Sequence, residues 1–227
     1  MAAGKPADVR VSRPGKQLFP EDGITKDEFV DYLRTVAETM LPYLRDRPVT
    51  LERYPDGYPG RSFFQKAAPD YFPDWIRTVE VAKEGGTVRM AVCDDEATLV
   101  YLANQAAVTL HPWLSGVARP HHPDKLILDL DPPDSDFGIV RWAAFTAREL
   151  FTDIGLQPVV MTTGSRGLHL VLPLDRAADF DAVRKFARQA ADLLAGRHPQ
   201  ELTTEVRKNK RRGRLYLDVQ RNAYAQT

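Results

Sequence analysis

The chain has 227 residues, of which 43% are hydrophobic and 27% charged, and its 31 basic residues balance 31 acidic ones. This composition is typical of a globular domain with a sizeable core, and it excludes a disordered or fibrous chain. No stretch approaches the roughly 20 consecutive apolar residues of a membrane-spanning helix. The single cysteine, Cys93, excludes an intrachain disulfide and a cysteine-based zinc site. We therefore expect a cytoplasmic protein without membrane association, and oxygen or imidazole ligands for any metal.

The N-terminal half predicts one long helix followed mainly by strands. Thr25 and Glu28 form a capping box before an apolar run with helical spacing, which Pro42 is expected to end. A second helix, capped by one of the aspartates at 94 and 95, is expected near its end. Short strands are predicted at 49–54, 62–66, 78–83, 87–92 and 108–111, the third and fourth forming a hairpin through Glu84-Gly-Gly86.

The C-terminal half alternates strands and helices. A densely apolar strand at 125–131 precedes a helix that is capped near Ser135 or Asp136, buries Ile154 among others, and stops at Gly155. The remaining elements are strands at 158–163 and 168–173, a helix at 180–195 that ends at Gly196, and a strand at 215–220. The pattern predicts an α/β fold in which a sheet flanked by helices packs with a strand-rich N-terminal lobe. We expect one domain, with lobes at 1–115 and 120–227.

Aspartates cluster on the predicted strands of the second half. Asp129 and Asp131 project to the same side of their strand, an arrangement that a divalent cation usually compensates. The alternative is that they are ordinary turn formers at a strand end. Asp218 is a third candidate, and three carboxylates fit the two-metal scheme for nucleotidyl transfer with Mg²⁺ or Mn²⁺. The alternative for Asp218 is a solvated residue paired with Arg214 or Arg221.

Two further segments are suited to phosphate. The turn between the strands at 158–163 and 168–173 carries Gly164 and Gly167, which let the backbone approach an anion, together with hydroxyl groups and Arg166. The alternative is an ordinary glycine hairpin. The run from Arg207 to Arg214 holds six positive charges in eight residues, which suits a nucleic acid backbone or a triphosphate. Its alternative is a solvated turn.

Motifs along nearly the whole chain carry a family resemblance. They are Ser12-Arg-Pro-Gly-Lys-Gln-Leu-Phe-Pro20 with Thr25-Lys26, Arg47-Pro-Val, Phe63-Phe-Gln-Lys66, Leu110-His111, Leu128-Asp-Leu-Asp-Pro132, Thr163-Gly-Ser-Arg-Gly-Leu-His169 and Leu217-Asp-Val-Gln-Arg-Asn222. In this order and spacing they resemble the polymerase domain of bacterial ATP-dependent DNA ligase D and its stand-alone relatives in the archaeo-eukaryotic primase superfamily. The resemblance implies a primase-like catalytic sheet and a polymerase that fills short gaps at DNA breaks, with a preference for ribonucleotides, in bacterial non-homologous end joining at the nucleoid.

The resemblance also implies roles for individual residues. The metal-binding and catalytic carboxylates are those of Asp129, Asp131 and Asp218. The residues expected at the incoming nucleotide are Phe63, His111, Thr163, Ser165, Arg166, Gly167, His169 and Lys208. The residues expected at the DNA are Lys16 and Lys26, which match lysines that grip a 5′-phosphate, together with Arg53 and Phe64. Stacking on an exposed ring is worth about 1–3 kcal/mol per base.

The implied partners are gapped or broken duplex DNA with a 5′-phosphate, NTPs and dNTPs, the end-joining factor Ku and a DNA ligase, although no local motif for Ku is identified. Thr163 and Arg166 stand where the family more often has serine and lysine, which bears on sugar selectivity. The family domain normally continues for several tens of residues beyond the third aspartate, so a C-terminally shortened domain is expected. The alternative functions are a catalytically weak module that binds 5′-phosphorylated DNA ends, and a two-metal nuclease with water as the nucleophile.

Overall fold

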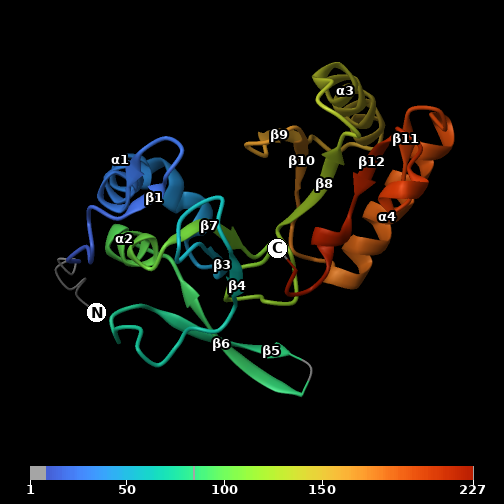
Figure 1. Cartoon of the computed structure of the whole chain (residues 1–227). Coiled ribbons are helices and arrows are strands. Elements are labelled where there is room, and N and C mark those ends of the chain that lie inside the picture. The colour runs from blue at the N-terminus through green and yellow to red at the C-terminus, as the bar shows by residue number, and fades with distance from the viewer. Residues whose placement is uncertain (1–8, 84, 227) are drawn as a thin grey trace. The chain divides into compact units, whose positions relative to one another are not determined.

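The computed structural model describes residues 9–83 and 85–226 (Figure 1). Contacts divide the chain into two compact units, one before Arg119 and one formed by Arg119–Gln226. Each unit combines helices with a β-sheet and has its own hydrophobic core. The α/β expectation is confirmed. Within the described part of the chain, no helix combines the length and apolar character that crossing a bilayer requires.

The first unit contains two helices, α1 (Lys26–Leu44) and α2 (Glu96–Asn104). The predicted capping box is present, because the Thr25 hydroxyl accepts from the Glu28 backbone N–H while the Glu28 carboxylate accepts from the Thr25 backbone. The prediction that Pro42 ends α1 is wrong. Pro42 lies in the last turn, where its missing N–H removes only one backbone hydrogen bond, and the buried Leu44 continues the apolar face of the helix.

The main sheet of the first unit has the strand order β4-β3-β6-β5, with β7 also pairing with β3. Its strands are β3 (Pro48–Arg53), β4 (Phe63–Gln65), β5 (Thr78–Lys83), β6 (Gly86–Val92) and β7 (Ala107–Pro112). All these pairs are antiparallel, and β5 and β6 pair as the predicted hairpin, whose residue Glu84 lies outside the described residues. Two short strands that the sequence did not predict, β1 (Gln17–Phe19) and β2 (Ile24–Thr25), form a separate pair before α1.

The second unit has a five-stranded sheet of order β11-β12-β8-β10-β9. Its elements are β8 (Lys125–Asp131), α3 (Phe137–Asp153), β9 (Val159–Thr162), β10 (Leu168–Pro173), α4 (Phe180–Arg197), β11 (Leu202–Thr203), the 3₁₀ helices η1 (Lys208–Lys210) and η2 (Gln220–Asn222), and β12 (Leu215–Asp218). Leu126, Leu128 and Leu130 of β8 pack in one cluster with residues of both long helices. Figure 1 shows α3 and α4 on the same side of β8. The alternate residues Asp129 and Asp131 therefore lie on the face that these helices leave open.

Three boundaries in the second unit differ from the predictions. Gly196 lies inside α4, which continues to Arg197, so glycine did not end this helix. Ile154 is the C-terminal cap of α3 and is 54% exposed, not buried, because Gly155 with φ +81° turns the chain there. Strand β12 ends at Asp218, and η2 replaces its expected last residues.

Candidate active site and cationic pocket

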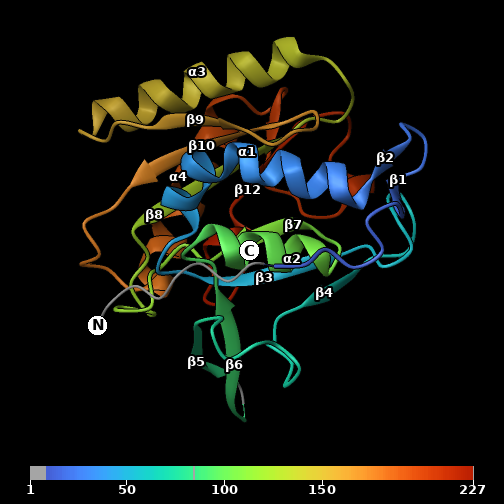
Figure 2. The ribbon, with the colours of Figure 1, turned by 90° about the vertical axis from the view of Figure 1, so that its left-hand side faces the viewer.

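A row of polar side chains crosses the open face of the sheet in the second unit (Figure 2 shows its strands from a second direction). Asp129 of β8 is paired in register with Asp218 of β12 on one side and with His169 of β10 on the other. Directly opposed residues in a sheet point to the same face, so these three side chains form one row. The His169 Nε2 lies 3.3 Å from a carboxylate oxygen of Asp129. Asp131 lies on the same face, two residues along β8.

Two arginines compensate this acidic face. The Arg211 guanidinium lies 2.7 Å from the Asp131 carboxylate and 4.0 Å from the centre of the Tyr216 ring. Arg221 lies 3.4 Å from Asp129. Burial, and next the Asp218 charge, raise the pKa of Tyr216, so this ring stays neutral beside the carboxylates.

Sequence reasoning missed both arginine contacts. The Asp218 carboxylate accepts the Gln220 backbone N–H at 2.7 Å, whereas Arg214 donates to backbone carbonyls and Arg221 pairs with Asp129. The alternative that pairs Asp218 with one of these two arginines is therefore not observed. The basic run was the available signal for Arg211, but a run of charges does not specify a pairing partner, which the folded chain sets.

Donor type and register decide whether these carboxylates suit a metal ion. Among residues 9–83 and 85–226, no group of three or more His, Cys, Asp or Glu side chains is gathered closely enough to hold an ion. The Asp129 and Asp218 side chains nevertheless stand opposite each other on paired strands, with about 5 Å expected between their Cβ atoms. Carboxylate oxygens are the ligands that Mg²⁺ and Mn²⁺ prefer. In chemistry and register the residues fit such ions, provided that the arginines move away.

His169 is the second feature of this face that fits a ligand. Its ring is buried, and its Nδ1 has no hydrogen-bond partner among the described residues. A buried polar atom without a partner costs about 1–3 kcal/mol, which a bound polar group would recover. His169 is therefore prepared to contact a ligand.

The glycine turn lies against the end of β8. The Thr163 hydroxyl donates to the Gly167 carbonyl at 3.1 Å and accepts from the Ser165 backbone N–H at 3.3 Å, so it shapes the turn. A Cβ at Gly167 would lie only 2.4 Å from the Leu130 carbonyl oxygen, which explains why glycine is needed there. Arg166 and Ser165 are exposed at the tip. The turn thus presents donors next to the strand that carries Asp129.

Lys208, the second residue of the basic run, begins η1, and its side chain is exposed. It belongs to the same segment as Arg211, which contacts Asp131. The structure therefore connects this run to the carboxylates but leaves Lys208 at the surface.

In the first unit, the two predicted aromatic residues of β4 lie on opposite faces of the sheet. Phe64 is paired with Glu52 of β3, and its ring lies 5.5 Å from the ring of His111 on β7. Phe63 is paired with Arg53, whose guanidinium carbon lies 5.4 Å from its ring centre. The rings are 61% and 45% exposed, respectively, so neither belongs to the core. The structure therefore groups His111 with Phe64, not with Phe63.

Glu52 is a further residue on the His111 face that sequence reasoning missed. One oxygen of its carboxylate accepts from the hydroxyls of Tyr54 and Ser62, at 2.8 and 3.1 Å, and the other lies 3.8 Å from the His111 Nε2. Burial, and next the hydrogen bond to Glu52, raise the pKa of Tyr54. The held carboxylate thus lies beside the imidazole of His111 but beyond hydrogen-bond distance.

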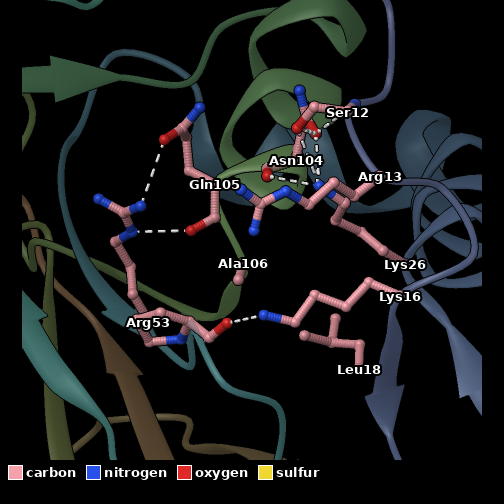
Figure 3. Close-up of a pocket in the computed structure, with 10 residues that line it drawn as sticks. Ser12, Arg13, Lys16, Leu18, Lys26, Arg53, Asn104, Gln105 and Ala106 are labelled. Carbon is pink, nitrogen blue, oxygen red and sulfur yellow. Dashed lines mark hydrogen bonds between the residues drawn. The ribbon is translucent and has the colours of Figure 1, made fainter.

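A cavity of about 330 Å³ opens in the first unit (Figure 3). Its lining includes four cationic side chains, those of Arg13, Lys16, Lys26 and Arg53. No carboxylate occurs among the described lining residues. A concentration of positive charge in a concave site is the electrostatic requirement for binding a phosphate.

Lys26 is the buried centre of this pocket. Its ammonium donates to the Ser12 hydroxyl and to the Asn104 side-chain oxygen, each at 3.0 Å, as Figure 3 shows. Burial, followed by repulsion from Lys16 and Arg13, lowers the pKa of Lys26 below its usual 10.5. The Lys16 ammonium donates to the Pro55 carbonyl at the other side of the pocket. An anion between these cations would relieve their repulsion.

Cys93 is excluded as a nucleophile. It is fully buried, and burial raises the pKa of its thiol to about 12. The candidate functional groups among the described residues are the acidic row, the glycine turn, the cationic pocket and the His111 face of the first sheet.

The described residues thus define an α/β protein with an acidic sheet face, an adjoining glycine turn and, in the first unit, a cationic pocket. A family model described as LigD, primase-polymerase domain matches residues 25–227, so the chain belongs to the LigD primase-polymerase domain family. The resemblance inferred from the motifs is confirmed.

Individual relatives support this membership. The chain is 33% identical over 214 residues to the bifunctional non-homologous end joining protein LigD of Bacillus subtilis, covering 93% of this chain and 34% of that protein. It is 31% identical over 236 residues to the multifunctional LigD of Mycobacterium tuberculosis, covering 100% and 31%. The chain thus spans about a third of the length of these relatives.

A solved structure shares the fold closely. It is the polymerase domain from Mycobacterium tuberculosis ligase D in complex with DNA, with a TM-score of 0.90 and 31% sequence identity. The match covers 96% of this chain and 79% of that one.

Proposed function

We propose that this chain is a DNA-directed primase-polymerase domain that adds ribo- or deoxynucleotides to a primer 3′-hydroxyl to fill short gaps at DNA breaks. The observation that carries the proposal is the Asp218–Asp129–His169 row beside the glycine turn. Family membership supports the same reaction, and the names of its relatives place them in non-homologous end joining. The two units would act as lobes of one domain, with a DNA ligase and Ku as partners in the bacterial cell.

In this proposal the acidic row serves nucleotidyl transfer. Asp129, Asp131 and Asp218 would hold Mg²⁺ or Mn²⁺, which would activate the primer hydroxyl and neutralise triphosphate oxygens. Arg211 and Arg221 keep the carboxylates paired until that exchange takes place.

The proposed nucleotide contacts come from several segments. The exposed tip of the turn, Ser165 and Arg166, binds phosphate oxygens with Lys208, while Thr163 and Gly167 maintain the shape of the turn. The buried imidazole of His169 positions a phosphate or sugar oxygen at its free Nδ1.

The first unit provides the DNA contacts. Lys16 and Lys26 bind a downstream 5′-phosphate in the cationic pocket, with Arg53 at its edge. We further propose that Phe64, together with His111, stacks on the incoming nucleotide, and that Phe63, together with Arg53, stacks on the DNA. This exchanges the roles expected for the two rings from the sequence.

Primer extension on a gapped duplex tests the proposal. A 5′-phosphate and a 5′-hydroxyl downstream end are compared, with ribo- and deoxynucleotides and with Mg²⁺ and Mn²⁺. Extension is expected to be stronger with the 5′-phosphate and to disappear in Asp129→Asn, which keeps the size of the side chain. Extension that survives in both Asp129→Asn and Asp218→Asn would refute the assignment of the acidic row.

A second candidate is a module that binds 5′-phosphorylated DNA ends with little catalysis. It is favoured by the arginine contacts on Asp129 and Asp131 and by the pocket that the first unit forms from its own residues. Absence of extension, together with 5′-phosphate-dependent binding that Lys26→Ala abolishes, would establish this alternative.

A further inference from the structure

Three exposed aromatic side chains of the first unit are connected, directly or through other rings, to Arg53 of the cationic pocket. They are Phe63, Tyr71 and Trp75, which are 45%, 60% and 41% exposed. We call these three residues the aromatic strip. Exposed apolar groups that cluster beside polar ones mark interaction surfaces. Neither Tyr71 nor Trp75 belongs to the sites described above.

Arg53 connects the strip to the pocket. One nitrogen of its guanidinium donates to the Tyr71 hydroxyl at 3.1 Å, and its central carbon lies 5.4 Å from the Phe63 ring centre. The same side chain lines the cationic pocket. The Gln105 carbonyl and the Gln65 side chain accept further hydrogen bonds from it, at 2.7 and 2.6 Å, so its position is fixed. Charge and aromatic surface are therefore continuous here.

The rings are supported from beneath. Tyr71 packs edge-on against the buried Phe72, with ring centres 5.5 Å apart. Tyr101 of α2 contacts Phe72 at 5.2 Å and Trp75 at 5.8 Å, again edge-on. Because the contacts within the cluster are edge contacts and the outer rings remain partly exposed, ring surface stays available for stacking. Rings held in this way lose little conformational entropy when a ligand binds.

We propose that the aromatic strip binds the unpaired bases of single-stranded DNA that extends from a 5′-phosphate held in the cationic pocket. Proteins that bind single strands combine aromatic rings, on which successive bases stack, with cations that follow the backbone. Arg53 adds a cation at the junction, beside the Phe63 ring. An apolar protein segment would gain nothing from the four adjacent cations, whereas DNA uses both parts of the surface. The inference rests on the proposed role of the pocket and extends it to the bases beyond the phosphate.

Equilibrium binding of oligothymidylate to the full chain tests the inference. The probes are the 5′-phosphorylated strand, its 5′-hydroxyl form, and a 5′-phosphorylated strand of equal length without bases. Tyr71→Ala and Trp75→Ala are each expected to weaken binding of the 5′-phosphorylated strand by about fivefold or more. The matched control Tyr43→Ala removes an exposed tyrosine of α1 that belongs neither to the pocket nor to the strip, so it is expected to bind as the unmodified chain does. The strand without bases is expected to bind all four proteins equally.

Two further readouts separate stacking from electrostatics. The salt dependence of binding is expected to stay unchanged in Tyr71→Ala and to become shallower in Lys26→Ala, since only the latter removes a phosphate contact. Stacking on Trp75 is expected to quench tryptophan fluorescence, and Trp75→Ala is expected to abolish this change.

The outcomes distinguish the inference from the proposed function. Unchanged affinity in both alanine variants would overturn the aromatic strip while leaving the pocket intact. An equal loss of affinity for the strand without bases would also overturn it, because no stacking is then involved. If the unmodified chain does not distinguish a 5′-phosphate from a 5′-hydroxyl, the pocket assignment itself fails.

Discussion

Replacing Asn222 by alanine is expected to destabilise the second unit strongly. Asn222 is fully buried in η2, just after β12 has ended. Its side-chain oxygen accepts the Ile127 backbone N–H at 2.8 Å, and its amide nitrogen donates to the carbonyls of Ile127 and Val219, at 2.6 and 3.0 Å. Register pairing of β12 with β8 extends only from Asp131 to Asp129. The Asn222 amide therefore replaces the missing strand as the partner of Ile127.

The expected loss in the free energy of unfolding follows from these three hydrogen bonds. Alanine leaves the buried N–H and carbonyl of Ile127 without this partner, at about 1–3 kcal/mol each, and removes a third bond worth about 1 kcal/mol. The free energy of unfolding is expected to fall by about 4 kcal/mol, a large part of the roughly 5–15 kcal/mol of a typical protein. Because the Asp218 carboxylate accepts the Gln220 N–H within the same turn, the proposed polymerase activity is expected to fall as well.

Urea unfolding of the unmodified chain, Asn222→Ala and Asn222→Asp measures the effect, with Asn209→Ala as the matched control at an exposed asparagine. Asn222→Asp keeps the shape but loses both donors, so it is expected to be destabilised at least as much at neutral pH. Amide hydrogen exchange at Ile127 is expected to accelerate in both variants. A loss below about 1 kcal/mol in Asn222→Ala, with unchanged exchange at Ile127, would refute the reasoning.

Three further predictions follow from the site and the turns. The pKa of Lys26 is lower in the folded chain than its usual 10.5, so folding stability is expected to rise as the pH increases from the folded-state pKa toward 10.5. The proposed affinity for a 5′-phosphate needs the charged form of Lys26, so it is expected to fall over the same pH range. Fluorescence anisotropy against pH measures the affinity, and equal pH dependence in Lys26→Met would contradict the prediction. Arg211→Gln removes the ion pair with Asp131, so Mn²⁺ affinity, measured by calorimetry, is expected to rise by about tenfold; unchanged affinity would show that the pair does not compete with the ion. Gly167→Ala places a Cβ 2.4 Å from a backbone oxygen and is expected to lower the free energy of unfolding by about 1–3 kcal/mol, whereas Gly196→Ala, in open space within α4, is expected to raise it by about 0.5–1 kcal/mol. Thermal unfolding of both glycine variants measures these changes. A Gly167→Ala variant that is more stable than Gly196→Ala would contradict the packing argument.

Local patterns in the sequence predicted most elements. The Thr25 capping box and the alternation of β8 depend on residues a few positions apart, and both occur as predicted. Two residues that usually end helices did not do so. The helix continues past Pro42 because Leu44 packs in the core, and Gly196 is tolerated within α4 at a position in open space. Family membership was also readable from the sequence, because the motifs keep their order along the chain.

The tertiary structure alone decided which groups meet. Alternation placed Asp129 and Asp131 on one face, but only the register of β12 and β10 set Asp218 and His169 beside Asp129. The pairing of Arg211 with Asp131 joins residues 80 positions apart, which no local pattern specifies.

In the first unit, too, the sequence predicted candidate residues and the tertiary structure decided their contacts. The family resemblance identified Lys26 and the two phenylalanines as candidates, and strand alternation placed the two rings on opposite faces. Folding determined that Lys26 is buried against Asn104, and that Phe64 meets His111 while Phe63 meets Arg53. Local periodicity fixes the direction in which a side chain points, whereas its partner depends on long-range pairing of strands and charges. The sequence by itself therefore determined most of the elements, the family and most candidate residues, and the tertiary structure decided how those residues are combined.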